Sequence, residues 1–184
     1  PHWIEEEPRA FVEIVKAHSI GALCHLWGGW PGDKQPGSAA QQVLYRWAQD
    51  VLAHGLAIGV PLDVGPSLVP ILSRPRGEDG LWPAEAFRRL LEEESARGES
   101  ALAEGLRRYG RDDPFPQAGF VDELIQRSTD VAADCEKSAQ GLAAHYPATA
   151  AICKELAARY RKTAADWQER NQDLLLERNQ MREP

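Results

Sequence analysis

Motifs that mark common catalytic and cofactor sites are missing from this chain of 184 residues. It contains no GxGxxG, GxxxxGKS, GxxxxGKT or GxSxG pattern, which argues against a dinucleotide fold, a P-loop and a nucleophile elbow. It also lacks the HxxxH, ExxH and HExxH spacings that place two metal ligands on one helix face. We therefore predict no cofactor and no metal, and the sequence assigns no catalytic residue.

Cysteine is also scarce, because the chain has only Cys24, Cys135 and Cys153, which lie far apart. Their odd number and wide spacing argue against a disulfide framework and favour free thiols in a reducing, cytoplasmic environment. Cys135 and Cys153 fall on or beside apolar stripes, where burial raises the pKa of a thiol. No apolar run approaches the roughly 20 residues that span a bilayer, so no membrane partner is expected.

Positive charge is in the minority, with 21 Lys and Arg against 28 Asp and Glu, and the formal net charge is -7. The acidic excess is spread along the chain without an acidic tail or a basic arm. Such a surface repels phosphate backbones, so nucleic acid is not expected as a partner. We expect Arg88 and Arg89 to form ordinary surface ion pairs with nearby acidic residues such as Glu92.

Strand signals are scarce, whereas helical periodicity recurs along the chain. The sequence predicts an all-α fold, a single-domain helical bundle over residues 1–184 with a long C-terminal αα-hairpin. Five prolines interleaved with apolar residues indicate an ordered segment at about 60–83, with one helical turn near 67–72 and a flexible tip at 74–80. The remaining parts are expected to be two helices in 1–59 (8–27 and 38–59), short helices in 84–118, and a hairpin in 119–184 that folds at Pro147.

Residues 119–146 and 148–180 carry apolar and small side chains at alternating three- and four-residue spacing, which is typical of helices packed along a common seam. Folding at Pro147 sets small residues against large ones. We expect Ser128 to lie near Trp167 and Cys135 near Tyr160. Residues 174–176 are three consecutive leucines, which cannot all lie on one side of a helix. At least one of them must contact a second surface, and this suggests a homodimer formed through the hairpin.

Imidazole and indole groups are concentrated in the first third of the chain. Residues 45–54, YRWAQDVLAH, resemble the histidine-bearing helix of DinB-like metal-binding bundles. That family adds two further histidines from a late helix, whereas the late helices here carry only His145, so the resemblance does not extend to a metal site. A pocket between the first two helices, suited to a small aromatic or cationic ligand, would be lined by His18, His25, Trp27, Trp30, Asp50 and His54.

Two classes of function remain open. The first is a non-enzymatic helical binding or assembly module that acts through protein–protein contacts, with another protein or with a second copy. The second is a small-molecule-binding protein, or a small helical enzyme, that uses the Trp/His-lined pocket. We favour the first because the hairpin is long and no convergent catalytic set is visible, while fold class alone says little about function.

Overall fold

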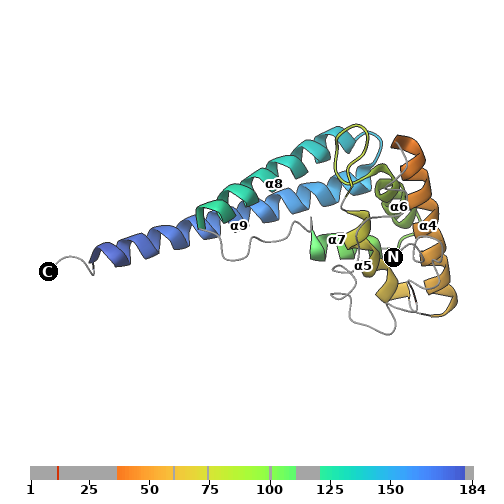
Figure 1. Cartoon of the computed structure of the whole chain (residues 1–184), viewed down its shortest axis with the longest axis horizontal. Coiled ribbons are helices and arrows are strands. Elements are labelled where there is room, and N and C mark those ends of the chain that lie inside the picture. Colours follow the sequence, from red (N-terminus) through yellow and green to blue (C-terminus); the bar gives the residue numbers. More distant parts are fainter. Residues whose placement is uncertain are drawn as a thin grey trace.

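The computed structural model describes residues 12, 37–59, 61–73, 75–99, 101–110 and 121–180. These residues form six helices and no strand, which confirms the all-α prediction with its C-terminal helix pair (Figure 1). The helices are α4 (Gly37–Ala57), α5 (Pro61–Leu72), α6 (Glu85–Ala96), α7 (Ala101–Tyr109), α8 (Val121–Leu142) and α9 (Pro147–Gln180).

Helix α5 is longer than the sequence predicted, because we expected one turn near 67–72 and the structure shows 12 residues of helix. Pro66 and Pro70 lie inside it and each removes a backbone hydrogen bond, a cost of about 3 kcal/mol in a helix interior. Burial offsets that cost, since one side of the helix enters the core through Val64, Leu68, Val69 and Leu72, all fully buried. The predicted helix 8–27 lies outside the described residues except Val12, which is helical and buried.

Helices α5 and α7 approach each other closely, and a glycine makes this possible. A Cβ on Gly105 of α7 would lie 2.7 Å from Val69 Cγ2 and 3.0 Å from Pro66 Cα. The first distance is shorter than real Cβ contacts, and the second is tighter than most of them, so a side chain at this position would force the two helices or Val69 to shift.

A buried guanidinium organises the connection between α5 and α6. The Arg88 side chain is 2% exposed, and its Nε donates to the carbonyl of Pro83 at 2.6 Å. One terminal nitrogen donates to Asp79 Oδ2 at 2.6 Å, and the other donates to Asp79 Oδ1 at 2.9 Å and to the Leu81 carbonyl at 2.6 Å. The guanidinium beside Asp79 lowers the pKa of that carboxyl. We predicted a flexible tip at 74–80; residue 74 lies outside the described residues, and within the rest Asp79 is bound to the buried Arg88.

Trp82 follows this loop and joins three parts of the molecule. Its indole is 1% exposed, and Nε1 donates to the carbonyl of Ser73 at 2.6 Å. Its backbone N–H donates to Ser138 Oγ on α8 at 3.0 Å, and its carbonyl accepts from the Cys153 thiol on α9 at 3.7 Å. The end of α5 and both hairpin helices therefore meet at one buried residue.

Side chains distant in sequence satisfy the free N–H groups at two helix starts. Gln41 Oε1 on α4 accepts from the N–H of Ala86 on α6 at 3.1 Å. Glu92 on α6 accepts from the N–H groups of Ala148 and Thr149 at the start of α9, at 3.2 and 2.9 Å. We expected Glu92 to pair with arginines at the surface, and this was wrong because the anion lies at the positive end of α9.

Helices α8 and α9 form an antiparallel hairpin, part of which projects away from the helical core (Figure 1). Asn171 donates to Asp122 at 3.1 Å near one end of α8, and Arg161 pairs with Glu136 farther along. These contacts follow the antiparallel register that the sequence predicted. Helix α9 continues to Gln180 and runs beyond the paired part of α8, and the side chains of 174–176 are outside the described set.

The first prediction concerns the buried guanidinium. Arg88→Met keeps an apolar stem but leaves one carboxylate and two carbonyls without their donor. We expect the free energy of unfolding to fall by about 3 kcal/mol, because a buried charge network is lost rather than replaced. Urea denaturation followed by tryptophan fluorescence measures the change.

The matched control is Arg97→Gln, which breaks the exposed pair between Arg97 and Glu99, whose side chains are 53% and 54% exposed. An exposed pair contributes at most about 1 kcal/mol. Equal losses for the two variants would contradict the organising role of Arg88.

Candidate functional site

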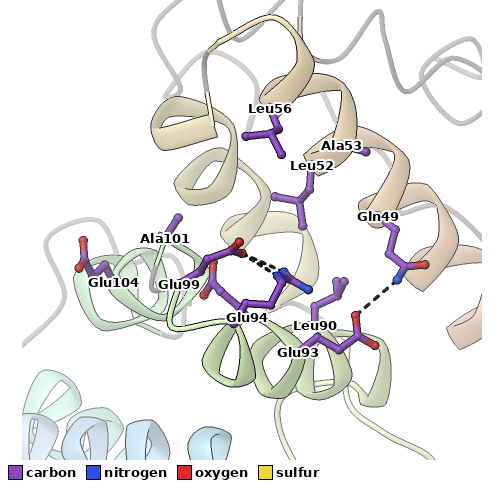
Figure 2. Close-up of a pocket in the computed structure, with 11 residues that line it drawn as sticks. Gln49, Leu52, Ala53, Leu56, Leu90, Glu93, Glu94, Glu99, Ala101 and Glu104 are labelled. Carbon is purple, nitrogen blue, oxygen red and sulfur yellow. Dashed lines mark hydrogen bonds and ion pairs between the residues drawn. The ribbon is translucent and has the colours of Figure 1, made fainter.

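A cleft of about 740 Å³ lies between α4, α6 and the start of α7 (Figure 2). Residues on one side of α4 form one wall, α6 forms the second, and the α6–α7 connection with α7 closes the end. Its lining consists of Gln49, Leu52, Ala53, Leu56, Leu90, Glu93, Glu94, Arg97, Glu99, Ala101 and Glu104.

The inner surface of the cleft is apolar. Leu52 and Leu56 are four residues apart on α4, so they lie on the same side of the helix and project toward α6 and α7 (Figure 2). Leu90 lies opposite on α6 and is 3% exposed. Leu56 is 67% exposed. Most of this apolar side chain therefore stays in contact with water in the described structure.

A polar network at one edge joins α4 to α6. The Tyr45 hydroxyl donates to Glu93 Oε1, and Gln49 Nε2 donates to Tyr45 Oη at 2.7 Å and to Glu93 Oε2 at 3.4 Å. The guanidinium of Arg89 lies 3.9 Å from the centre of the Tyr45 ring. Burial, followed by the hydrogen bond to the Glu93 carboxylate, raises the pKa of Tyr45, so this phenol stays protonated as the donor.

Glu94 lies deeper and holds the start of α7. Its carboxylate, in a residue only 4% exposed, accepts from the N–H of Leu102 at 2.9 and 3.0 Å and from the N–H of Ala103 at 3.1 Å. These bonds favour the ionised form, but burial outweighs them and raises the pKa of Glu94. The residue therefore connects the cleft lining to the position of α7.

Acidic side chains outnumber basic ones around the cleft. Four glutamates line it against one arginine, Arg97, which donates to Glu99 at 3.0 Å. The hydrogen bond and the charge of Glu99 raise the pKa of Arg97. With its guanidinium engaged by a carboxylate of the same rim, the cleft has a negative electrostatic character.

The structure places two of the six predicted pocket residues. Asp50 is exposed and His54 is half-buried on α4, and neither lines the cleft. His18, His25, Trp27 and Trp30 lie outside the described residues, so the pocket predicted between the first two helices stays a prediction.

One feature of the sequence, the position of two leucines on α4, does indicate a wall of the cleft. Leu52 and Leu56 fall beside the apolar stripe that contains Leu44, Trp47 and Val51, and an off-stripe leucine pair indicates a second contact surface.

The chemistry of the cleft favours binding. Its described lining combines carboxylates, one amide, one guanidinium and apolar groups, without a hydroxyl, thiol or imidazole to serve as nucleophile. Across the described part of the chain, no group of three or more His, Cys, Asp or Glu residues is placed to hold a metal ion. None of the helices in that part combines the length and apolar character that crossing a bilayer requires.

Comparisons of this chain with protein-family models, curated proteins and solved structures find no match.

Two thiols are structural. Cys135 and Cys153 form no disulfide bond and are 0% exposed. Burial raises the pKa of Cys153 to about 12, with the nearby Cys135 contributing. This confirms the sequence-based interpretation of both residues as buried small apolar groups, and for Cys153 it also confirms the raised pKa.

A second prediction follows for these thiols. In a Cys24→Ser variant, we expect a thiol-specific disulfide reagent to leave Cys135 and Cys153 unmodified at about pH 8, because the thiolate is scarce and covered. Both should react once urea unfolds the chain, as measured by release of the chromophore. Rapid labelling of the native protein would contradict the burial.

A third prediction concerns Glu94, whose pKa in the folded state is raised above the ordinary value of 4.5. The native state then binds the proton more tightly than the unfolded chain, so this contribution to stability is complete below the unfolded pKa and is lost as pH rises through the folded pKa. We expect the free energy of unfolding of the wild type, relative to Glu94→Gln, to decrease as pH rises above about 4.5. Urea titrations at several pH values test this, and a constant difference would refute it.

Proposed function

We propose that this protein is a non-enzymatic assembly module that pairs with a second copy of itself through the α8–α9 hairpin. The observation that carries the proposal is the shape of the hairpin. Within the described structure, α8 reaches the helical core through its C-terminal half, where Asp134 accepts from Arg76 at 2.7 Å and Ser138 accepts from Trp82. Its N-terminal half projects together with α9 (Figure 1).

A projecting pair of helices cannot cover its own apolar seam. Near the core the seam is buried, as Cys135 and Leu156 show. Toward the far end, the side chains of the same seam are only half-buried, and these are Val121, Leu124, Ile125 and Trp167. In a pair of helices, each seam residue is covered on one side only. A four-helix bundle covers it on all sides, so a second hairpin would complete the packing.

Charge favours a second copy as the occupant. Helix α8 has five acidic and two basic side chains, whereas α9 has five acidic and six basic ones. In a two-fold symmetric pair, α8 of one copy can lie along α9 of the other, and the reciprocal contact repeats the same match. The pairing of Arg161 with Glu136 within one hairpin shows the kind of contact that such a bundle would repeat.

The fourth prediction is that sedimentation equilibrium at micromolar concentration gives twice the mass of the chain. Leu124→Glu places a charge on the half-buried seam, and we expect it to weaken association by at least about tenfold, because a buried unpaired carboxylate is costly. Lys137→Glu, an exposed change on the same helix, is the control and should leave the dimer intact. Circular dichroism verifies that both variants keep their helices.

A monomer at these concentrations in the wild type would overturn the proposal. So would equal weakening by the two variants, because that result would assign the association to overall charge rather than to the seam.

A further inference from the structure

We propose that the cleft between α4, α6 and α7 binds a small organic cation with an apolar body, such as an arylalkyl amine. This inference is independent of hairpin pairing, since the cleft and the projecting arm use different residues. It rests on three properties of the cleft: its apolar interior, the excess of carboxylates on its rim, and its size.

The apolar interior is the first property. Leu52, Leu56 and Leu90 face a common space, and Figure 2 shows the two α4 leucines directed toward the residues of α6. Leu56 keeps two thirds of its surface in water, at 67% exposure. Covering such a side chain with a hydrocarbon or aromatic group contributes roughly 25 cal/mol of favourable binding free energy for each Å² of apolar surface removed from water.

The rim decides the charge of the ligand. Glu94 lies deeper and holds the start of α7, which leaves Glu93, Glu99 and Glu104 on the rim. The one guanidinium that lines the cleft is paired with Glu99 at 2.9 Å, so the rim keeps an excess of negative charge. An anionic ligand would meet repulsion from this rim, and a neutral ligand would lack the attraction between opposite charges. An ammonium group gains from every carboxylate within several ångströms, and more at the edge of an apolar cleft than in open water.

The volume of the cleft favours a small organic molecule over a simple ion or a folded protein. A volume of about 740 Å³ falls within the roughly 300–1,000 Å³ of sites for small organic molecules. A metal ion or a methylammonium ion would leave the leucines uncovered. A polyamine would supply charge without the apolar body that the interior requires.

The experiment uses the full chain with carbon-13-labelled leucine methyl groups, titrated with 4-phenylbutylamine at low ionic strength. We expect a Kd below about 1 mM, with the largest methyl shifts at Leu52, Leu56 and Leu90. Two further probes separate the contribution of the charge to binding from that of the aromatic ring. 4-Phenylbutan-1-ol lacks the charge and n-butylamine lacks the ring, and we expect each to bind at least about tenfold more weakly.

Two exposed substitutions test the site without disturbing the core. Leu56→Ser removes apolar surface and should weaken 4-phenylbutylamine about tenfold. Glu104→Gln removes one rim charge and should weaken it about three- to tenfold, with a smaller effect at high salt. Glu169→Gln is the matched control, because it removes the same charge from an exposed position on α9.

Several results would overturn the inference. They are no measurable binding of 4-phenylbutylamine, equal affinity for the alcohol, equal affinity for n-butylamine, and methyl shifts confined to leucines outside the cleft. An equal effect of Glu104→Gln and Glu169→Gln would also overturn it, because the charge would then act through the whole protein rather than through the rim.

Discussion

The burial of the Arg88 guanidinium is the constraint on which the centre of the molecule depends. A full positive charge inside a protein is tolerated only when acceptors surround it. Here one carboxylate and two carbonyls do so, and all three belong to residues 79–83. Because Arg88 must be surrounded by acceptors, its hydrogen bonds fix the path of the loop that contains residues 79–83. That path places Trp82 where α5, α8 and α9 converge.

Hydrogen bonds at the starts of helices are a second feature that fixes how the helices are arranged. Gln41, Glu92 and Glu94 each accept N–H groups at the beginning of another helix, on α6, α9 and α7 respectively. A local capping residue fixes only its own helix, whereas these side chains fix the position of one helix relative to another. Helix α6 takes part in all three contacts, since it receives one cap and provides two. It is the element that relates the cleft to the hairpin.

The sequence was sufficient for the helices whose stability comes from a periodic apolar face, including the hairpin and its register. It failed for α5, because two internal prolines argue against a helix locally while complete burial of Leu68 and Leu72 stabilises it. It also failed for Arg88 and Glu92, which are ordinary surface residues by local pattern. Their partners lie nine and about 57 residues away, and no local pattern reports such contacts. For the cleft, the off-stripe pair Leu52 and Leu56 indicates one wall, but the other walls come from separate helices that no local pattern brings to it.

Helix α9 has 34 residues, so at 1.5 Å per residue it is a continuous rod about 50 Å long. Its first turn is anchored by Glu92, and the two residues that follow Glu92 on α6 line the cleft. The far end of a long rod moves farther than its anchored part when the rod rotates. A tilt of about 5° at that anchor displaces the opposite end by about 4 Å, given this length. The position of the C-terminal end of α9 is therefore highly sensitive to the orientation in which α6 and the core hold its first turns.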